Sequence, residues 1–180
     1  MAVICDAGPL VALLDRREQS HSWVSAQFSR LHEPVHTCEA ALAEVAFLTR
    51  GRGLSPHHFM QLMHRGLVKV DFDFDGEWRS VGKLLDVYSN LPMSLADACL
   101  VRMSELHAKS VVFTLDRDFL IYRRNRRLRI PLLKIAALAT LAGLPAQTLH
   151  SKIRRSGGLT PEESAALHNA LAGVNLAVAK

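Results

Sequence analysis

The chain has 180 residues, 49% of them hydrophobic and 22% charged, a balance typical of one globular domain with a substantial core. Its formal net charge of +5 favours polyanionic partners but identifies none. The sequence has no basic segment leading into a short apolar run, and no apolar run of about 18 residues or more. We therefore expect a cytoplasmic protein with neither a secretory signal nor a membrane span.

The three cysteines are predicted to be structural. Cys5, Cys38 and Cys99 stand in apolar contexts and form no C-x-x-C pair. Such residues are typical of small buried side chains in a reducing compartment. We therefore expect neither a disulfide nor a cysteine-bound zinc.

Short apolar runs alternate with segments of helical periodicity along the chain. Strands are predicted at residues 2–6, 34–38, 67–72, 111–114 and 130–133. Helices are predicted at residues 10–15, 20–31, 39–50, 55–66, 76–89, 94–107 and 134–142. This alternation indicates an α/β sandwich around a mainly parallel sheet, in which ligands collect outside the carboxyl ends of the strands.

The composition changes near residue 143. Residues 151–158 have the basic, glycine-containing sequence of a linker, and a capping box begins a predicted helix at 160–176. We expect a domain over residues 1–143 and a C-terminal extension over residues 144–180. The helix of the extension is too short to be a domain, so we expect it to pack on the domain or on another subunit.

Four acidic residues stand where predicted core elements meet loops. Asp6 ends the first strand, Asp116 follows the strand at 111–114, and Glu44 and Asp97 lie on otherwise apolar helices. Like charges gathered at the edge of a core are unfavourable unless a cation holds them, and a divalent metal is the usual cation. The four positions therefore predict a metal site at the carboxyl edge of the sheet.

Three of these acids also have a structural interpretation. Asp6 precedes Ala-Gly-Pro and could cap a turn or a helix. Ser94 and Asp97 have the spacing of a capping box. Asp116 and Asp118 flank the start of a short predicted helix, which one of them should cap; we favour Asp116 as the site residue and Asp118 as the cap or a supporting residue.

The helix at 39–50 offers two candidate acids. Glu44 has no lysine or arginine three or four residues away, so a helical ion pair does not account for it, although a solvent-facing glutamate would have the same pattern. Glu39 lies in the first turn, where a negative charge stabilises the helix dipole. We therefore assign the site role to Glu44.

The motifs D-A-G-P-L, A-L-A-E-V, S-L-A-D-A and T-L-D-R-D-F follow one another along the chain. In this order they resemble a PIN domain, and specifically the small prokaryotic VapC-type toxins, over about residues 1–140. The resemblance implies a three-layer α/β/α fold and a Mg²⁺- or Mn²⁺-dependent endoribonuclease that forms a homodimer and is silenced by a cognate antitoxin. The resemblance also implies which residues form the site. The catalytic acids would be Asp6, Glu44, Asp97 and Asp116. The metal ligands would be Asp6, Asp97 and Asp116, supported by Thr114 and Asp118.

RNA hydrolysis requires an activated water and stabilisation of the charge that develops on the phosphate. Two metal ions roughly 4 Å apart can supply both, and carboxylate oxygens suit Mg²⁺. In this hypothesis Asp6 and Asp97 are the main ligands, Glu44 orients a water, and Asp116 binds the second ion or positions the nucleophile. In-line attack would leave a 5′-phosphate and a 3′-hydroxyl, and single-stranded loops of structured RNA are the expected substrate.

A basic run follows the fourth acid within a few residues. Residues 123–129 contain five arginines and no acid, which is more than a solvated surface requires. Guanidinium groups suit phosphates. We therefore expect an RNA backbone to be held close to the acidic pocket by Arg123, Arg124, Arg126, Arg127 and Arg129.

Two other classes of protein fit parts of the pattern. An aspartate-based phosphatase also gathers aspartates at strand ends, but no lysine stands at a suitable following strand end. A non-catalytic RNA- or protein-binding module would keep the fold and lose the metal. The segment 71–76 fails as a calcium loop because Gly82 replaces the glutamate required at the twelfth position; we expect Phe72 and Phe74 in the core and Asp75 as the cap of the next helix.

Overall fold

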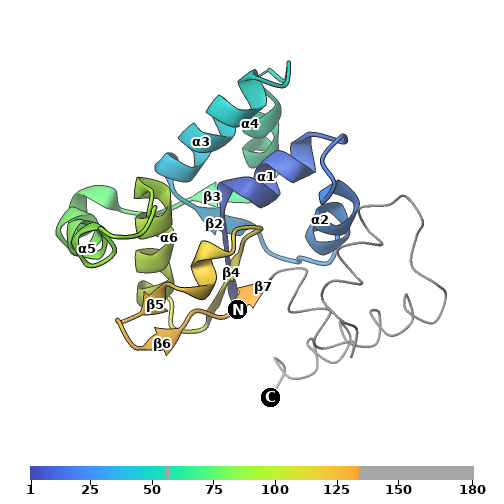
Figure 1. Cartoon of the computed structure of the whole chain (residues 1–180). Helices are drawn as coiled ribbons and strands as arrows, with labels where there is room; N and C mark the ends of the chain where they lie inside the picture. Colours follow the sequence, from blue (N-terminus) through green and yellow to red (C-terminus); the bar gives the residue numbers. More distant parts are fainter. Residues whose placement is uncertain (56, 134–180) are drawn as a thin grey trace. The chain divides into compact units, whose positions relative to one another are not determined.

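The computed structural model describes residues 1–55 and 57–133 (Figure 1). The predicted helix at 134–142, the linker and the helix of the extension lie outside the described residues. No helix within the described residues is long and apolar enough to cross a membrane.

The centre of the fold is a five-stranded sheet in the order β3-β2-β1-β4-β7. β1 runs parallel to both β2 and β4, and β2 runs parallel to β3. Strands covered on both faces read as continuous apolar runs, and β1 (A-V-I-C) and β4 (S-V-V-F) have such sequences. The strands are β1 (Ala2–Cys5), β2 (Val35–Thr37), β3 (Val68–Val70), β4 (Ser110–Phe113) and β7 (Leu132–Leu133).

Helices cover both faces of this sheet. α6 packs on β1 and β4, and it also contacts α3 and α5. Figure 1 shows α1 and α2 on the opposite side of the sheet from α5 and α6. The predicted three-layer α/β/α fold with a mainly parallel central sheet is thus confirmed. The helices are α1 (Ala7–Leu14), α2 (His21–Phe28), α3 (Glu39–Arg50), α4 (His57–His64), α5 (Phe74–Val87) and α6 (Leu95–Leu106).

Three local predictions need correction. α1 begins at Ala7 rather than near residue 10, because proline is tolerated in the first turn of a helix, where its missing N–H has no intrahelical acceptor. α5 is capped by Asp73, whose side chain accepts a hydrogen bond from the Gly76 N–H, and not by Asp75. Phe74 is 42% exposed, so it lies outside the core.

The three cysteines are buried, as predicted. Cys5, Cys38 and Cys99 are all free thiols and all buried. Cys38 precedes the first residue of α3, and Cys99 lies in the second turn of α6. Both belong to the apolar cluster that holds these two helices together, so their structural assignment follows from packing.

After β4 the chain forms a short 3₁₀ helix, η1 (Asp118–Leu120), and a two-stranded antiparallel hairpin. The strands of the hairpin are β5 (Arg123–Arg124) and β6 (Leu128–Arg129). Sequence periodicity did not predict this hairpin, because its strands are only two residues long and carry no apolar alternation. Most of the basic run therefore lies in an ordered element.

Candidate metal centre at the carboxyl edge of the sheet

Asp6 lies where β1 ends and α1 begins, and its carboxylate is held on both oxygens. Oδ1 accepts a hydrogen bond from the Ala7 N–H at 2.6 Å, and Oδ2 accepts one from the Thr114 hydroxyl at 2.8 Å. The Asp6 N–H donates to the Phe113 carbonyl at 3.0 Å, which joins the carboxyl ends of β1 and β4. Asp6 is only 7% exposed, so its carboxylate is almost completely buried at the edge of the core.

Thr114 connects Asp6 to the loop that follows β4. Its buried hydroxyl donates to Asp6 and accepts a hydrogen bond from the Asp116 N–H at 2.9 Å. Asp116 is exposed, and its Oδ1 accepts from the Asp118 N–H at 2.9 Å. The supporting position predicted for Thr114 therefore has a physical basis. Asp118, predicted as the cap or a supporting residue, is the first residue of η1 and does not cap it; Arg117 stands at the N-cap position without a side-chain hydrogen bond.

Asp97 forms the predicted capping box at the start of α6. The Ser94 N–H donates to Asp97 Oδ2 at 2.9 Å, and the Asp97 N–H donates to the Ser94 hydroxyl at 3.0 Å. The Tyr122 hydroxyl lies 3.5 Å from the same Asp97 oxygen. Tyr122 is fully buried beside Tyr88 and Phe119. No local motif distinguished Tyr122 in the sequence, so its position beside Asp97 was missed.

The pKa values of these carboxyl groups show that the four acids are electrostatic neighbours. Burial, together with the negative charges of Asp97 and Glu44, raises the pKa of Asp6 to about 7, although the hydrogen bonds from Thr114 and Ala7 act to lower it. Burial also raises the pKa of Asp97, with contributions from the charges of Asp116 and Glu44. Loss of hydration penalises a charged carboxylate, and a nearby like charge adds to that penalty.

The same electrostatics distinguish the two candidate acids of α3. Glu44 is half-buried, and its charge acts on Asp6 and Asp97. Glu39 is exposed in the first turn of the helix, and its charge acts instead on the thiols of Cys38 and Cys99. The structure therefore groups Glu44, and not Glu39, with the other three acids.

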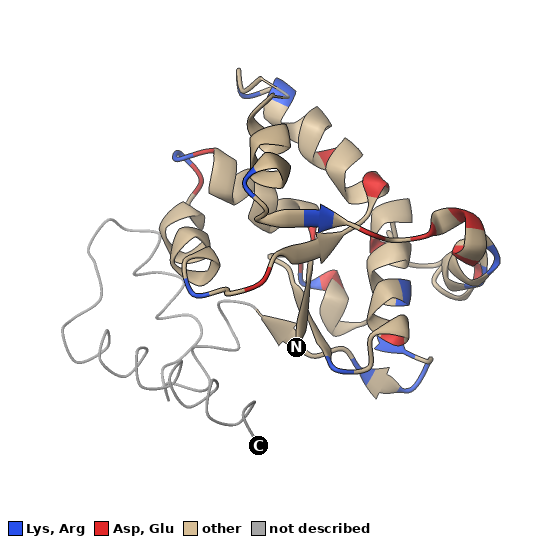
Figure 2. Ribbon diagram, turned by 180° about the vertical axis from the view of Figure 1, so that it is seen from behind, with Lys and Arg blue, Asp and Glu red and all other residues tan. Residues whose placement is uncertain are grey.

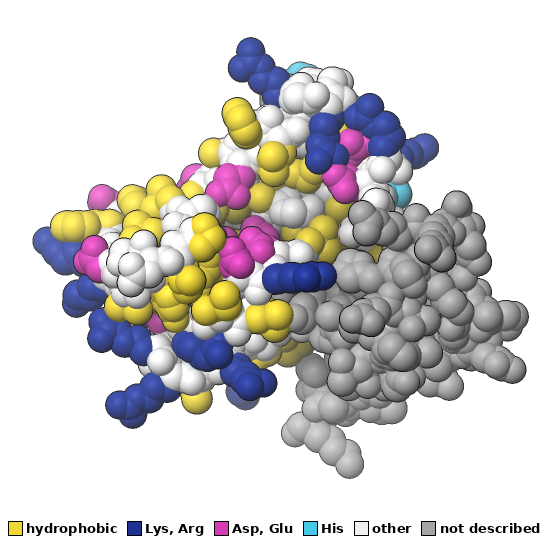
Figure 3. Space-filling view, viewed as in Figure 1, with side chains coloured by type: hydrophobic (Ala, Val, Ile, Leu, Met, Phe, Trp, Pro, Cys, Tyr) yellow, Lys and Arg dark blue, Asp and Glu magenta, His cyan; other side chains and the backbone are white. Residues whose placement is uncertain are grey.

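No cationic side chain compensates this group within the described residues. None of the ion pairs there involves any of the four acids. Figure 3 shows acidic side chains gathered near the centre of one face, among hydrophobic ones. For brevity we call Asp6, Glu44, Asp97 and Asp116 the acidic group.

The donor atoms of the acidic group fit a hard divalent cation, which prefers oxygen ligands. As they stand, the described residues contain no three His, Cys, Asp or Glu side chains close enough together to hold a metal ion. A carboxylate has about four lone-pair sites, so the hydrogen bonds from Ala7, Thr114 and Ser94 leave Asp6 and Asp97 able to coordinate. A bound cation would also remove the like-charge repulsion that raises their pKa values.

An apolar cleft of about 630 Å³ is lined by residues close in sequence to two of the acidic group: Ala43 precedes Glu44, and Leu95 lies two residues before Asp97. The cleft opens between the starts of α3, α5 and α6. Its lining includes the acids Glu39, Asp73 and Asp75, so phosphate groups do not suit it. Ala43 also lines a second hollow together with Glu44 and Phe47. The lining residues include Cys38, Glu39, Ala40, Phe72, Asp73, Phe74, Asp75, Leu95 and Cys99.

The basic run does not lie where we predicted it. The Arg124 guanidinium donates hydrogen bonds to the carbonyls of Ala108 and Ser110, which places the hairpin at the amino end of β4, the end opposite to Asp116. Arg124 is 6% exposed, and one Arg123 nitrogen, Nη1, donates to three backbone carbonyls of residues 120–122. Arg124 is therefore a structural residue rather than an RNA contact, and the hairpin is not adjacent to the acidic pocket.

Comparison with known families bears on the whole site. A search of curated proteins found no match. The PIN domain family matches residues 3–125, a range that contains the acidic group, Thr114 and the first strand of the hairpin. Because this match covers more than half of the chain, the protein belongs to the PIN-domain family, whose members are in general metal-dependent nucleases.

Proposed function

We propose that this protein is a Mg²⁺- or Mn²⁺-dependent endoribonuclease that cleaves single-stranded regions of structured RNA. The observation that carries the proposal is the acidic group: four carboxyl groups at the carboxyl edge of a parallel sheet are electrostatic neighbours, and no described cationic side chain pairs with them. Such an arrangement costs folding free energy in the apo protein, so it is expected to be retained for a ligand.

Asp6, Asp97 and Asp116 would hold the cation in this proposal. A bound divalent ion supplies stabilisation of phosphate charge and lowers the pKa of a bound water. Thr114 fixes the orientation of Asp6 through its hydroxyl, and the capping box fixes Asp97 through Ser94. These hydrogen bonds hold ligand oxygens in place before any ion arrives.

Glu44 is proposed to act on the attacking water. It lies on α3, its charge acts on Asp6 and Asp97, and no described residue forms an ion pair with it. Its carboxylate is thus available to accept a hydrogen bond from the water and orient it. Attack by water in line with the leaving 3′-oxygen would give a 5′-phosphate and a 3′-hydroxyl.

We further propose that the nuclease is the toxin of a toxin–antitoxin pair and acts as a homodimer. The apolar cleft supports an inhibitory protein partner, because its hydrophobic and acidic lining residues suit an amphipathic segment with basic side chains. Induced expression without an antitoxin should then arrest growth, and light scattering should give twice the chain mass. A monomer without toxicity would restrict the proposal to a free-standing nuclease.

Cleavage of structured RNA with Mn²⁺ or Mg²⁺ tests the catalytic proposal. Wild type should cut, and Asp6→Asn and Glu44→Gln should each lose activity while remaining folded. Glu39→Gln is the matched control, because it makes the same chemical change on the same helix outside the acidic group.

Equal cleavage by wild type and Asp6→Asn would reveal a contaminating nuclease and overturn the assignment. Absence of both cleavage and metal-induced stabilisation in wild type would favour a non-catalytic binding module. Trapping of a phosphorylated aspartate would instead identify the chain as a phosphatase.

A further inference from the structure

The hairpin β5–β6 presents arginines at a tight turn. Asn125 and Arg126 at its tip have φ values of 49° and 61°, and the Arg127 N–H donates to the Arg124 carbonyl at 3.2 Å. Asn125, Arg126 and Arg127 connect the paired residues Arg124 and Leu128. Two successive left-handed residues are typical of a tight hairpin turn, where glycine and asparagine are the usual residues. An arginine at this position is unusual, so its side chain is held at the tip at some conformational cost.

The base of the hairpin is anchored inside the fold. The Arg124 guanidinium donates to the Ala108 carbonyl at 2.7 Å and to the Ser110 hydroxyl at 3.0 Å, and burial lowers its pKa. The Asn125 N–H donates to Glu105 Oε1 at 2.9 Å. One arginine of the run thus anchors the hairpin, and the backbone that carries the remaining arginines is held against α6 and β4.

Three arginines of the hairpin remain exposed and without an ion pair among the described residues. They are Arg126, Arg127 and Arg129. The nearest acid on α6, Glu105, is occupied by Arg102 at 2.8 Å, so it does not neutralise them. Lys109, which is also exposed, adds a fourth positive charge next to Ala108. Figure 2 shows this basic colouring on the hairpin.

The hairpin and the acidic group lie at opposite ends of α6. Asp97 stands in the first turn of this helix, and Glu105, which bonds the hairpin, stands in the last. Eight residues at 1.5 Å per residue separate them by about 12 Å along the helix axis. A duplex carries one phosphate per about 3.4 Å on each strand, so this span corresponds to roughly four phosphates.

We infer that the hairpin is a second RNA-binding surface, remote from the cleavage centre, and that the preferred substrate is a folded RNA long enough to contact both. The inference rests on the proposed ribonuclease function for the contact at the acidic group. Three exposed guanidinium groups on an anchored turn provide several phosphate contacts without reading sequence. A strand of only two or three nucleotides bound at the acidic group does not span this distance.

RNA binding measured without cleavage tests this inference. The full chain carrying Asp6→Asn keeps the RNA intact, and the probes are a labelled stem-loop RNA and a short oligonucleotide of three nucleotides from its loop. The hairpin variant adds Arg126→Gln, Arg127→Gln and Arg129→Gln. The matched control adds Arg30→Gln, Arg50→Gln and Arg65→Gln, three exposed arginines that form no ion pair within the described residues.

The hairpin variant should bind the stem-loop at least about tenfold more weakly, and the slope of log Kd against log salt should fall by about 2 to 3, since each lost phosphate contact removes about 0.7–0.9. For the short oligonucleotide, the slope of log Kd against log salt should already be shallow with the protein that keeps the three arginines. Equal weakening by the control variant, or equal slopes for the two RNAs, would overturn the inference. Because the readout is binding, an inactive wild type would refute the nuclease proposal and leave this result intact.

Discussion

The two ends of α1 carry two buried aspartates with opposite surroundings. Asp6 caps the amino end and Asp15 the carboxyl end, and they are 7% and 4% exposed. The helix dipole favours a negative charge at the first position and disfavours one at the second. The pKa values run the other way: that of Asp6 is raised, and that of Asp15 is lowered well below its usual range.

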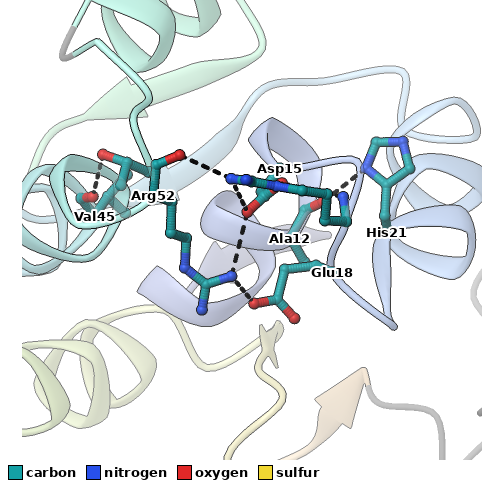
Figure 4. Close-up of polar contacts among 8 residues, drawn as sticks. Ala12, Asp15, Glu18, His21, Val45 and Arg52 are labelled. Atoms are coloured by element: carbon teal, nitrogen blue, oxygen red, sulfur yellow. Dashed lines mark hydrogen bonds and ion pairs between the residues drawn. The ribbon is translucent and has the colours of Figure 1, made fainter.

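Arginines account for the difference. Asp15 accepts hydrogen bonds from Arg17 at 2.9 Å and 3.2 Å and from Arg52 at 3.3 Å, and Arg52 also pairs with Glu18 (Figure 4). Direct hydrogen bonds to a charged carboxylate outweigh the dipole, which acts through partial charges. Among the described residues, arginines therefore pair with the structural carboxylate Asp15, and no cationic side chain pairs with the acidic group.

Exchanging each aspartate for asparagine should separate function from stability. Asp6→Asn should lower metal-dependent cleavage by at least about 100-fold, because even outer-shell changes at metal sites cost about 10- to 100-fold. Asp15→Asn should keep cleavage and lower the midpoint of urea unfolding, since its arginine hydrogen bonds weaken. Cleavage assays and urea titrations on both variants measure the two effects. Loss of cleavage in an Asp15→Asn protein that is fully folded would contradict the assignment of Asp15 to stability alone.

Mn²⁺ should raise the Tm of the protein, and this rise should depend on Asp6 at the amino end of α1 and not on Asp15 at its carboxyl end. At a concentration about 100 times its Kd, a ligand that binds only the folded state adds about 2.7 kcal/mol. For a chain of this size that is a rise in Tm of roughly 5–10 °C. Thermal unfolding should show this rise in wild type and Asp15→Asn, and no rise in Asp6→Asn. An equal rise in all three would place the ion elsewhere.

The α/β architecture follows from the sequence because strands and helices depend on local signals, whereas the members of the acidic group are predicted from the order of four motifs along the chain. Apolar runs of strand length are readable, and the bounds of α3 match residues 39–50 as predicted. The capping box of Ser94 and Asp97 is a contiguous motif whose hydrogen bonds are set by local backbone geometry.

The position of the basic run could not be predicted, because it depends on a reversal of the chain. The sequence puts Arg123 seven residues after Asp116, and nearness in sequence suggested nearness in space. Tyr122 and Phe119 are drawn into the core beside α6, and this packing turns the chain back along β4. The buried anchor made by Arg124 depends on carbonyls of residues 108 and 110, a contact for which no local pattern exists.

The pH dependence of stability in EDTA should have opposite signs at the two aspartates. A carboxyl whose folded pKa is raised above its usual value of 3.8 to about 7 stabilises the fold at acidic pH and loses that contribution as pH rises through the interval. Between pH 5 and pH 8 this amounts to roughly 2 kcal/mol for Asp6. Urea unfolding of metal-free wild type should therefore weaken over this range, and Asp6→Asn should remove most of the change.

Asp15 provides the internal contrast in the same titration. Its lowered pKa means that its contribution is fully present above about pH 4 and is lost only as pH falls further. Asp15→Asn should thus leave the change between pH 5 and pH 8 as in wild type. A pH profile for Asp6→Asn that coincides with wild type would show that Asp6 is not the group that titrates.

The smallest effect is expected at Thr114, whose hydroxyl links two members of the acidic group. Thr114→Val removes the hydrogen bond to Asp6 and leaves the Asp116 N–H without its acceptor, at a cost of about 1–2 kcal/mol. It should also weaken Mn²⁺ affinity about tenfold, as the loss of an orienting contact does at metal sites. Thr49→Val is the matched control, because Thr49 is equally buried and bonds only carbonyls of its own helix. Calorimetric titration with Mn²⁺ should separate the two variants; equal affinities would mean that Asp6 is oriented by the Ala7 N–H alone.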